Sequence, residues 1–256
     1  MSAYFDMHCH LLYGVDDGPE SIEESLGLLH LEYDDGVRTV FLTPHYRKGM
    51  FECPADQIAR HFSLLKDRAK ERFPDLTLIL GCEIHVNVDV VQRIKNGQCF
   101  PMGDTEHVLL EFPEYVDRRY FIEKCYDVIN DGYSPVIAHA ERCTAIRSDI
   151  SLLQRLVDMG VQIQMNAGSI IGEEGLRCKW FCRKAMEHNL LHYVGSDAHN
   201  RNCRKPNIGK CAAYIEKIMG ADYRDKIMRI NPKEMAEGSA EEENESEHEK
   251  RCRAGG

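Results

Sequence analysis

The stretch of sequence that decides the fold is Phe5-Asp6-Met7-His8-Cys9-His10, followed in the next loop by Val15-Asp16-Asp17-Gly18-Pro19. The first run is short and largely apolar, and it predicts a β-strand in which His8 and His10 point to the same face. The acidic pair lies in the loop just beyond that strand. Imidazoles and carboxylates that converge at one strand end suit Zn, Mn or Fe. Taken alone, the two histidines fit a core strand equally well, so the rest of the chain has to decide.

Length, composition and charge limit what the chain can be. Its 256 residues, 43% of them hydrophobic, correspond to one domain of barrel size or to two small ones. The formal charge of −10 argues against nucleic acid as the main partner. The eleven cysteines are scattered and include no Cys-x-x-Cys pair, so we expect free thiols. Because no apolar run approaches the roughly 20 residues of a membrane span and no secretory signal begins the chain, we expect a cytoplasmic protein without membrane insertion.

Strand-like and helix-like patterns alternate along most of the chain. We expect strands at residues 4–9, 39–43, 76–84, 107–112, 135–139, 162–166 and 192–195. Apolar residues at helical spacing predict helices at residues 22–33, 58–69, 120–129, 149–159 and 206–219, the last being the final packed element. Seven strands alternating with helices indicate a parallel α/β sheet, either open or closed into a barrel.

A closed barrel is the better prediction for this sheet. No glycine-rich dinucleotide or Walker loop follows any strand. Polar residues recur instead at the carboxyl end of strand after strand, where barrels of the TIM type carry their active sites. We therefore expect a TIM-like barrel domain at residues 1–234. Residues 235–256 are acid-rich and nearly free of apolar side chains, and they predict a disordered tail.

Candidate metal ligands gather at these strand ends. The first strand and its loop supply His8, His10, Asp16 and Asp17, and later strand ends supply His45, Glu83, His85, Glu111, His139, Asp197 and His199. Buried carboxylates and imidazoles without partners cost several kcal/mol each, so a core would not collect them without a cation. The ligands are too many for one ion. Two or three neighbouring ions fit better, as in enzymes where paired metals clamp the oxygens of a phosphoryl transfer.

These motifs carry a family resemblance. His8-x-His10, Asp17-Gly18, Pro44-His45, Glu83, Glu111, His139 and Asp197-x-His199 resemble the polymerase-and-histidinol-phosphatase (PHP) superfamily, whose members are distorted seven-stranded barrels with three metals. The stretches 15–19, 45–52, 136–142 and 196–200 look like those of manganese-dependent protein tyrosine phosphatases from bacterial capsule and exopolysaccharide loci. The resemblance runs from about residue 4 to residue 232 with the motifs in the same order. It implies an α/β fold, a distorted TIM-like (β/α)7 barrel of the PHP type.

The resemblance also implies a ligand set. One metal would be held by His8, His10, Glu83 and Asp197; Glu83 would bridge to a second ion held with Glu111 and His139; and Asp17, His45 and His199 would hold a third. Asp16 is the alternative to Asp17, because spacing alone does not separate them. His85 is interpreted as part of the pocket wall or as a residue behind the ligands, and not as a ligand. The implied cofactor is Mn²⁺, with two or three ions bound, and Fe or Zn are the alternatives.

Arginines are the candidates for holding phosphate. Arg142 and Arg204 resemble the phosphate-binding arginines of this family, a role that suits the guanidinium fork because it binds two oxygens at once. With Asp197 and His199 they form the predicted catalytic set. Arg47 is a further candidate for substrate binding. Lys48 beside it is better interpreted as part of a solvated loop.

The function implied is hydrolysis of phosphotyrosine on the tail of a bacterial tyrosine kinase that controls capsular or exopolysaccharide synthesis. A cysteine-based phosphatase is excluded, because no cysteine has an arginine six residues later, as Cys-x5-Arg requires. A histidinol-phosphate phosphatase of the same superfamily is the main alternative. A nuclease is disfavoured by the negative charge, and a non-catalytic metal-binding partner of a kinase is disfavoured by the full ligand set. The oligomeric state stays open.

Overall fold

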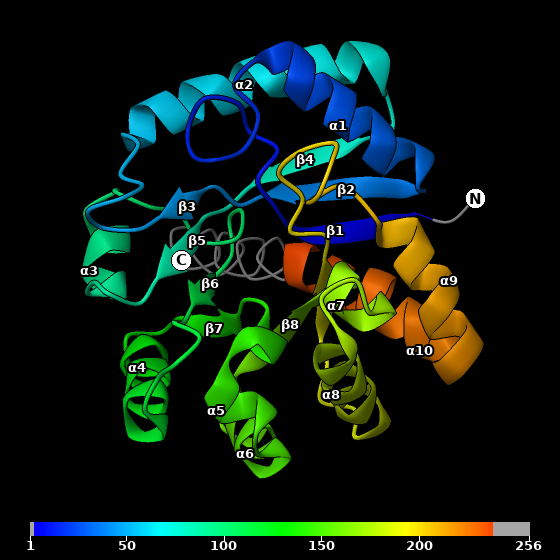
Figure 1. Cartoon of the computed structure of the whole chain (residues 1–256). Coiled ribbons are helices and arrows are strands. Elements are labelled where there is room, and N and C mark those ends of the chain that lie inside the picture. Colours follow the sequence, from blue (N-terminus) through cyan, green and yellow to red (C-terminus); the bar gives the residue numbers. More distant parts are fainter. Residues whose placement is uncertain (1–2, 238–256) are drawn as a thin grey trace, which may run out of the picture.

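Parallel strands form the centre of the molecule and helices cover their outer side (Figure 1). The computed structural model describes residues 3–237. Its strands are β1 (Tyr4–Cys9), β2 (Val37–Leu42), β3 (His45–Tyr46), β4 (Thr77–Leu80), β5 (Glu83–His85), β6 (His107–Glu111), β7 (Ser134–Ile137), β8 (Gln162–Asn166) and β9 (Tyr193–Gly195). They pair in the orders β1-β2-β4 and β3-β5-β6-β7-β8-β9, with every pair parallel. All carboxyl ends therefore lie on one face.

The two sheets are continuous with each other. The chain passes from β2 into β3 and from β4 into β5 with two residues between the strands, and the Gly81 N–H donates to the Leu42 carbonyl across the junction (2.9 Å). At the opposite edge, β1 and β9 are joined by a parallel bridge between Cys9 and Ala198. The Asp197 N–H also donates to the His8 carbonyl there (2.8 Å). The result is a strongly curled parallel sheet.

All seven predicted strands are present, but one of them is interrupted and the short strand β3 is additional. The strand expected at residues 76–84 is split into β4 and β5, and the short β3 follows Pro44, which has no N–H to donate to a ladder. The bend at Gly81 is tightly packed, because a Cβ there would lie 3.0 Å from the Met102 sulfur and 3.3 Å from the Thr43 methyl group. These breaks direct His45 and Glu83 toward the carboxyl face.

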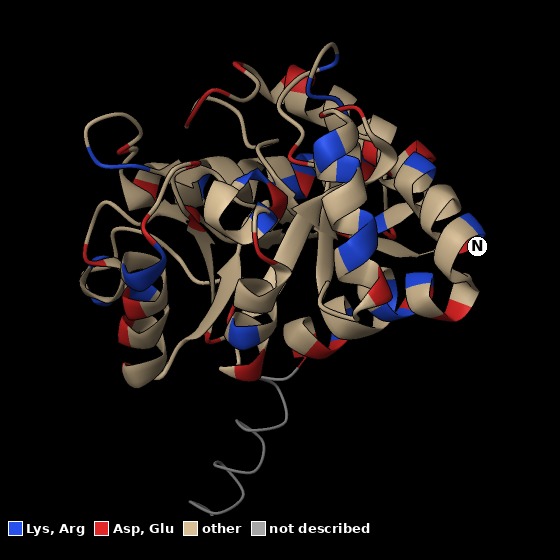
Figure 2. Cartoon of the chain, turned by 60° about the horizontal axis from the view of Figure 1, so that its bottom comes forward, with Lys and Arg blue, Asp and Glu red and all other residues tan. Residues whose placement is uncertain are grey.

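Helices connect the strands and carry most of the charge. They are α1 (Ile22–Asp34), α2 (Ala55–Arg72), α3 (Val90–Lys95), α4 (Arg118–Asn130), α5 (Thr144–Arg147), α6 (Ile150–Asp158), α7 (Ala167–Ile171), α8 (Leu176–Glu187), α9 (Ile208–Met219) and α10 (Ala221–Asp225). The five predicted helices are confirmed to within a few residues, whereas α3, α5, α7, α8 and α10 were not predicted. Figure 2 shows charged residues spread over the helices and loops, while the strands between them are almost entirely uncharged.

The described residues end, at residue 237, in a helix that covers the amino ends of the strands. After α10 come a π-helical turn, η2 (Lys226–Ile230), and further helical residues up to 237. Met235 is 4% exposed and packs with Met7, Phe41 and Tyr193. The prediction that residues 206–219 are the last packed element is therefore wrong. Asn231-Pro232 suggested a break, but the helical residues continue through Pro232 to residue 237.

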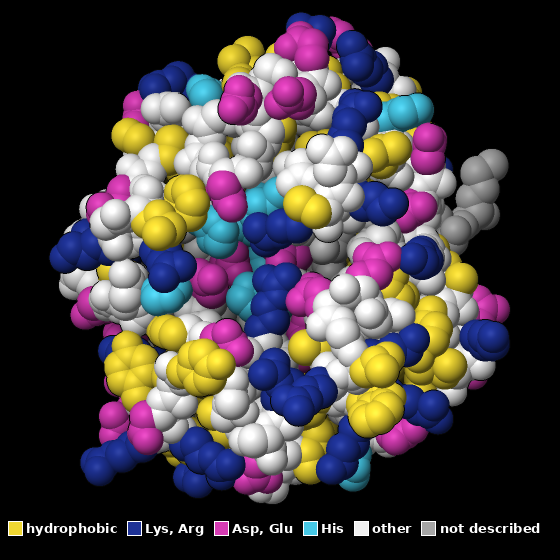
Figure 3. Space-filling view, viewed as in Figure 1, with side chains coloured by type: hydrophobic (Ala, Val, Ile, Leu, Met, Phe, Trp, Pro, Cys, Tyr) yellow, Lys and Arg dark blue, Asp and Glu magenta, His cyan; other side chains and the backbone are white. Residues whose placement is uncertain are grey.

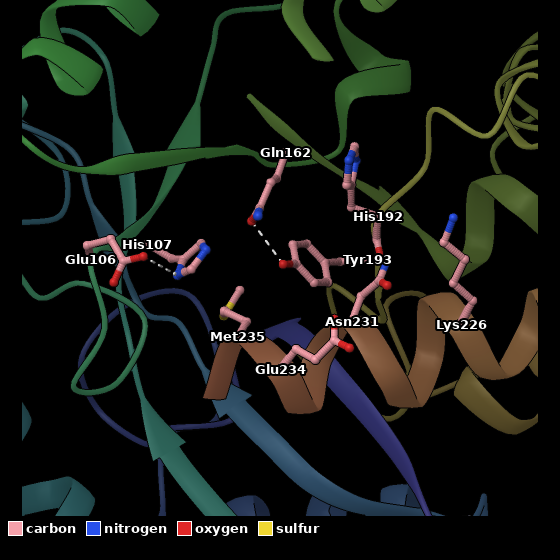
Figure 4. A pocket seen from close by; sticks show the side chains of 9 residues that line it. All are labelled: Glu106, His107, Gln162, His192, Tyr193, Lys226, Asn231, Glu234 and Met235. Atoms are coloured by element: carbon pink, nitrogen blue, oxygen red, sulfur yellow. Dashed lines mark hydrogen bonds and ion pairs between the residues drawn. The ribbon is translucent and has the colours of Figure 1, made fainter. Parts of the chain in front are cut away.

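This terminal helix overlaps the first residues of the expected disordered tail. The boundary placed between residues 234 and 235 falls inside the described helix, and residues 238–256 of the expected tail lie outside the described residues. Beside the helix is a cavity of about 430 Å³ whose lining includes His107, His192, Tyr193 and Met235 (Figure 4). The Tyr193 hydroxyl donates to Gln162 Oε1 at its edge (2.9 Å). None of the predicted site residues lines this cavity.

Two further expectations concern cysteines and membranes. All ten cysteines within residues 3–237 are free thiols, as predicted. Within the same residues, no helix combines the length and the apolar character that crossing a bilayer requires.

Candidate metal centre

The predicted metal ligands all lie at the carboxyl face of the curled sheet. Figure 3 looks onto this face and shows histidine side chains in a hollow near its centre, with acidic and basic side chains around them. His8 and His10 are fully buried, and Glu83, Asp197 and His199 are at most 3% exposed. Ligand-type atoms fall into three overlapping groups, within each of which all atoms lie within 4.8 Å of one another: His8, His10 and Asp197; His10, Asp17, His45 and His199; and His45, Glu83 and Glu111.

Glu83 lies at the meeting point of these groups. Its Oε2 atom is 3.4 Å from His8 Nε2, 3.2 Å from His10 Nε2 and 2.9 Å from His45 Nδ1. Its Oε1 atom is 2.8 Å from His139 Nε2. Burial alone would raise the pKa of Glu83, but the surrounding imidazoles hold it well below its ordinary value. One carboxylate thus faces four histidines from three strand ends, which is the arrangement of a bridging ligand.

Asp16 and Asp17, which spacing could not separate, occupy different positions. Asp17 Oδ1 is 3.3 Å from His199 Nε2 and 3.7 Å from His45 Nε2, so it faces the cluster. Asp16 Oδ2 instead accepts hydrogen bonds from His10 Nδ1 (2.8 Å) and from the backbone N–H of His45 (3.0 Å). Asp16 therefore orients His10 from behind. Burial would lower the pKa of His10, but its hydrogen bonds to Asp16 and Glu83 raise it to about 10.

The loop that carries these aspartates needs a glycine. A Cβ at Gly18 would lie 2.1 Å from the carbonyl oxygen of His10, closer than any side chain tolerates. The Gly18 N–H also donates to Asp16 Oδ1 (3.0 Å). The Asp-Asp-Gly motif is thereby folded back against the end of β1, which places Asp17 over the histidines.

Unpaired polar atoms test whether the site fits metal ions. Glu83 Oε2, Glu111 Oε2, His45 Nδ1 and His199 Nε2 are buried atoms without a well-aligned hydrogen bond, although the nitrogen and oxygen atoms of the cluster come as close as 2.9 Å. Leaving such atoms unsatisfied costs about 1–3 kcal/mol each. Imidazole nitrogens and carboxylate oxygens are the ligands that Mn, Fe and Zn accept, and a cation satisfies all of them at once. The donor set therefore fits a cluster of divalent ions.

Backbone strain is concentrated at the same place. His139 and Asp197 have φ angles of 33° and 55°, in the left-handed region that non-glycine residues seldom adopt. Such conformations cost of order 1–3 kcal/mol and occur mostly at functional sites, where the surrounding structure enforces them. The strain directs both side chains into the cluster.

Two arginines border the cluster as predicted. Arg142 Nη1 donates to Asp197 Oδ2 (2.8 Å) and Arg204 Nη2 donates to Asp197 Oδ1 (2.7 Å). Burial would raise the pKa of Asp197, but His8, Arg142 and Arg204 hold it well below its usual range. Both guanidinium groups line a small polar pocket of about 80 Å³ beside the cluster. The pocket is a suitable position for an anionic group.

The remaining candidates lie at the rim. Arg47 is half-buried and its backbone pairs with Phe51, whose ring stacks on His45 with centroids 5.0 Å apart. Lys48 is exposed. His85 belongs to none of the three ligand groups; burial lowers its pKa, which Glu111 partly offsets.

Sequence reasoning missed the residues that support the ligands. Gln164 and Asn166 on β8 are fully buried and bond to ligand candidates, and Glu174 binds Arg142. The alternation of Gln164 and Asn166 with apolar residues in the strand was an available signal, since both side chains point to one face. Nothing in the sequence indicates that Glu174 reaches the site from the loop before α8.

Comparisons with known proteins agree with this geometry. Residues 4–237 match the family model described as capsular polysaccharide synthesis, CpsB/CapC. The chain is 34% identical over 235 residues to tyrosine-protein phosphatase CpsB of Streptococcus pneumoniae, covering 90% of this chain and 97% of the relative. It is 35% identical over 218 residues to tyrosine-protein phosphatase YwqE of Bacillus subtilis, covering 85% of each.

Solved structures extend the comparison to the fold. The chain superimposes with a TM-score of 0.84, at 32% identity and over 91% of its length and 94% of the other chain, on a structure from work on YwqE and CpsB, described there as unique metal-dependent tyrosine phosphatases. The phosphotriesterase homology protein of Escherichia coli gives a TM-score of 0.62 at 10% identity, over 92% of this chain and 99% of that one, which shows a shared fold alone.

Proposed function

The chain belongs to the CpsB/CapC family of capsular polysaccharide synthesis, and we propose that it is a metal-dependent protein tyrosine phosphatase. Its substrate is phosphotyrosine on a bacterial tyrosine kinase that controls capsular or exopolysaccharide synthesis in the cytoplasm. The observation that carries the proposal is the set of overlapping His, Asp and Glu groups with unpaired buried atoms beside Arg142 and Arg204. Relatives that share about a third of the sequence bear the name tyrosine-protein phosphatase.

We assign the ligands to two or three Mn²⁺ ions, with Fe or Zn as alternatives. His8, His10, Glu83 and Asp197 form one site; Glu83, Glu111 and His139 form a second; and Asp17, His45 and His199 form a third. Asp17 is assigned as the ligand because its carboxylate faces His199. Asp16 is assigned as the residue that orients His10 because it accepts a hydrogen bond from His10 Nδ1. The position of His45 Nδ1 beside Glu83 also places this histidine next to the second site.

The protein's own groups bind and orient the substrate. Bound divalent ions would supply positive charge for the phosphoryl oxygens and would lower the pKa of a water molecule. Arg142 and Arg204 offer N–H groups to the phosphate from the polar pocket, and they keep the carboxylate of Asp197 fixed between them. Arg47 at the rim attracts the anionic substrate. The chain has no Cys-x5-Arg nucleophile, and we infer that water attacks phosphorus directly and in line, breaking the P–O bond to tyrosine and releasing phosphate and a phenolate that takes up a proton.

We also propose that the curled sheet is the distorted (β/α)7 barrel of the PHP type. Counting β2 with β3 and β4 with β5 as interrupted single strands reduces the nine strands to seven. The bridge between Cys9 and Ala198 brings the last strand against the first.

Two ligand variants test the proposed activity. His139→Ala removes the imidazole that contacts Glu83. Asp197→Ala removes the carboxylate that binds Arg142 and Arg204. Both variants are expected to abolish phosphate release from a phosphotyrosine peptide with Mn²⁺ present. His188→Ala, on the exposed end of α8, is the control for a lost imidazole. Circular dichroism checks that each variant is folded. Wild-type rates in both ligand variants would refute the assignment.

A further inference from the structure

Gln164 and Asn166 form a buried polar link beneath the candidate ligands. Both lie on β8, point to the same face of the sheet and are fully buried. Burying two amides costs stability unless every hydrogen bond is made, so their partners indicate what the pair does.

Three contacts join this pair to three candidate ligands, and a fourth joins its two members. Asn166 Nδ2 donates to Asp197 Oδ2 (2.9 Å), and Gln164 Nε2 donates to Asn166 Oδ1 (3.0 Å). Gln164 Oε1 accepts from the backbone N–H of His139 (2.7 Å) and lies 3.2 Å from His8 Nδ1. The link therefore reaches β1, the end of β7 and the end of β9.

The ends of the link determine the direction of every hydrogen bond in it. The carboxylate of Asp197 only accepts, so the amide group of Asn166 faces it with its NH₂ and turns its oxygen toward Gln164. Gln164 must then donate to Asn166 and present its own oxygen to His139 and His8. Because that oxygen only accepts, His8 carries a hydrogen on Nδ1 and presents Nε2 to the cluster, where His10 Nε2 is 3.1 Å away.

The link also explains what holds the strained backbone of His139. The N–H of this residue, whose φ is 33°, is bound by Gln164 Oε1 in the shortest contact of the link. Space for the Gln164 amide depends on Gly195, because a Cβ there would lie 2.8 Å from Gln164 Nε2 and 2.5 Å from His8 Cβ. A side chain at residue 195 would push Gln164 and His8 apart.

We propose that Gln164 is a positioning residue of the metal centre, which sets the tautomer of His8, the backbone of His139 and, through Asn166, the orientation of Asp197. The inference rests on the proposed function, because it takes these three residues as ligands. Outer residues that orient metal ligands are worth about 10- to 100-fold in metal affinity. A residue that only fills the core would change stability and leave metal affinity alone.

The test compares Mn²⁺ binding, measured by isothermal titration calorimetry on metal-stripped full-length protein, between three variants. Gln164→Met keeps the volume and loses every hydrogen bond, and we expect it to bind Mn²⁺ about 10- to 100-fold more weakly than wild type. Gln164→Glu keeps the oxygen that His8 and His139 need but loses the N–H that Gln164 donates to Asn166, so we expect a smaller loss of Mn²⁺ affinity than in Gln164→Met. Gln162→Met is the matched control on the same strand, because Gln162 contacts Tyr193 and no ligand.

Each outcome decides the proposal. Gln164→Met with wild-type affinity, or Gln164→Glu as weak as Gln164→Met, would overturn it while leaving the proposed function intact. Wild-type protein that binds no Mn²⁺ would overturn both. If Gln164→Met does not fold, ¹⁵N NMR of the wild-type histidines decides the matter, with the His8 signals identified by comparison with His8→Asn. A hydrogen on His8 Nδ1 supports the link, and a bare Nδ1 contradicts it.

Discussion

Glu174 binds the guanidinium of Arg142 through two parallel hydrogen bonds, Oε2 to Nε (2.9 Å) and Oε1 to Nη2 (3.0 Å). Glu174 lies in a turn between Gly172 and Gly175, whose φ angles of 98° and 97° only glycine adopts without strain. The turn thus brings a carboxylate against an arginine that we expect to bind phosphate. Glu174 holds Arg142 in place and also puts a negative charge beside the anion pocket.

Removing that charge is expected to strengthen phosphate binding. In Glu174→Gln, less repulsion acts on the phosphate, so KM for a phosphotyrosine peptide and the inhibition constant of inorganic phosphate should fall about two- to fivefold. Glu187→Gln is the matched control, because Glu187 is exposed at the end of α8, pairs with Arg183 and does not line the pocket. Steady-state kinetics at low ionic strength measures both. A rise in KM for Glu174→Gln would mean that holding Arg142 outweighs the repulsion.

Replacing Arg142 by lysine should be costly although the charge is kept. Lysine cannot reach Asp197, Glu174 and a phosphate together, since it lacks the planar fork. Hydrogen bonds to charged groups contribute about 1.5–3 kcal/mol, so kcat/KM should fall about 10- to 150-fold in Arg142→Lys. Arg183→Lys, whose side chain pairs with Glu187 on the surface of α8, is the control. Equal activity of the two variants would contradict a phosphate-binding role.

His192 should make stability depend on pH. Burial and the nearby charge of Lys226 lower its pKa from 6.5 to about 4. The unfolded chain therefore takes up a proton below pH 6.5 that the folded protein takes up only near pH 4. Stability falls as the pH decreases through this window, by about 1–3 kcal/mol for this group.

A variant isolates the contribution of His192. In His192→Gln, the free energy of unfolding, measured in urea between about pH 7 and pH 4.5, should decline less steeply than in the wild type. His188→Gln, which changes an exposed histidine nearby, should follow the wild-type curve. Parallel curves for His192→Gln and the wild type would show that His192 titrates alike in the folded and unfolded states.

The terminal helix should be part of the folded domain. Met235→Ala leaves a cavity among the apolar side chains at the amino ends of the strands and should lower the free energy of unfolding by about 2–5 kcal/mol. Ile230→Ala on the same helix, where the side chain is 51% exposed, should cost far less. Denaturant unfolding compares the two. Equal effects would show that the helix is not packed as described.

Much of this fold could be predicted from hydrophobic periodicity and from the residues that typically begin and end helices. The helix at residues 22–33 has a serine before it and acidic residues in its first turn, and Ser21 does cap it by accepting from the Glu24 N–H. Breaks such as those around Pro44 and Gly81 were not predictable, because they depend on how neighbouring strands curl. The helix beyond Pro232 was missed because proline usually ends a helix, and only tertiary packing of Met235 reveals that this one continues.

The candidate site could likewise be predicted from the sequence only in part. Side chains at successive strand ends must meet if the sheet is parallel, so His45, Glu83 and His139 could be brought together by counting strands. The separate positions of Asp16 and Asp17 could not be predicted, because adjacent loop residues differ only in how the turn at Gly18 directs them. Gln164 was missed because the role of a buried amide depends on its hydrogen-bond partners, which the sequence does not show.

The most direct test of the central claim is phosphate release by metal-stripped protein reconstituted with Mn²⁺, comparing a phosphotyrosine peptide with histidinol phosphate. We predict metal-dependent release from the peptide and little from histidinol phosphate. Preference for histidinol phosphate would leave the metal centre in place and contradict the tyrosine phosphatase assignment. No release from either substrate would contradict the assignment of the cluster as a phosphatase site.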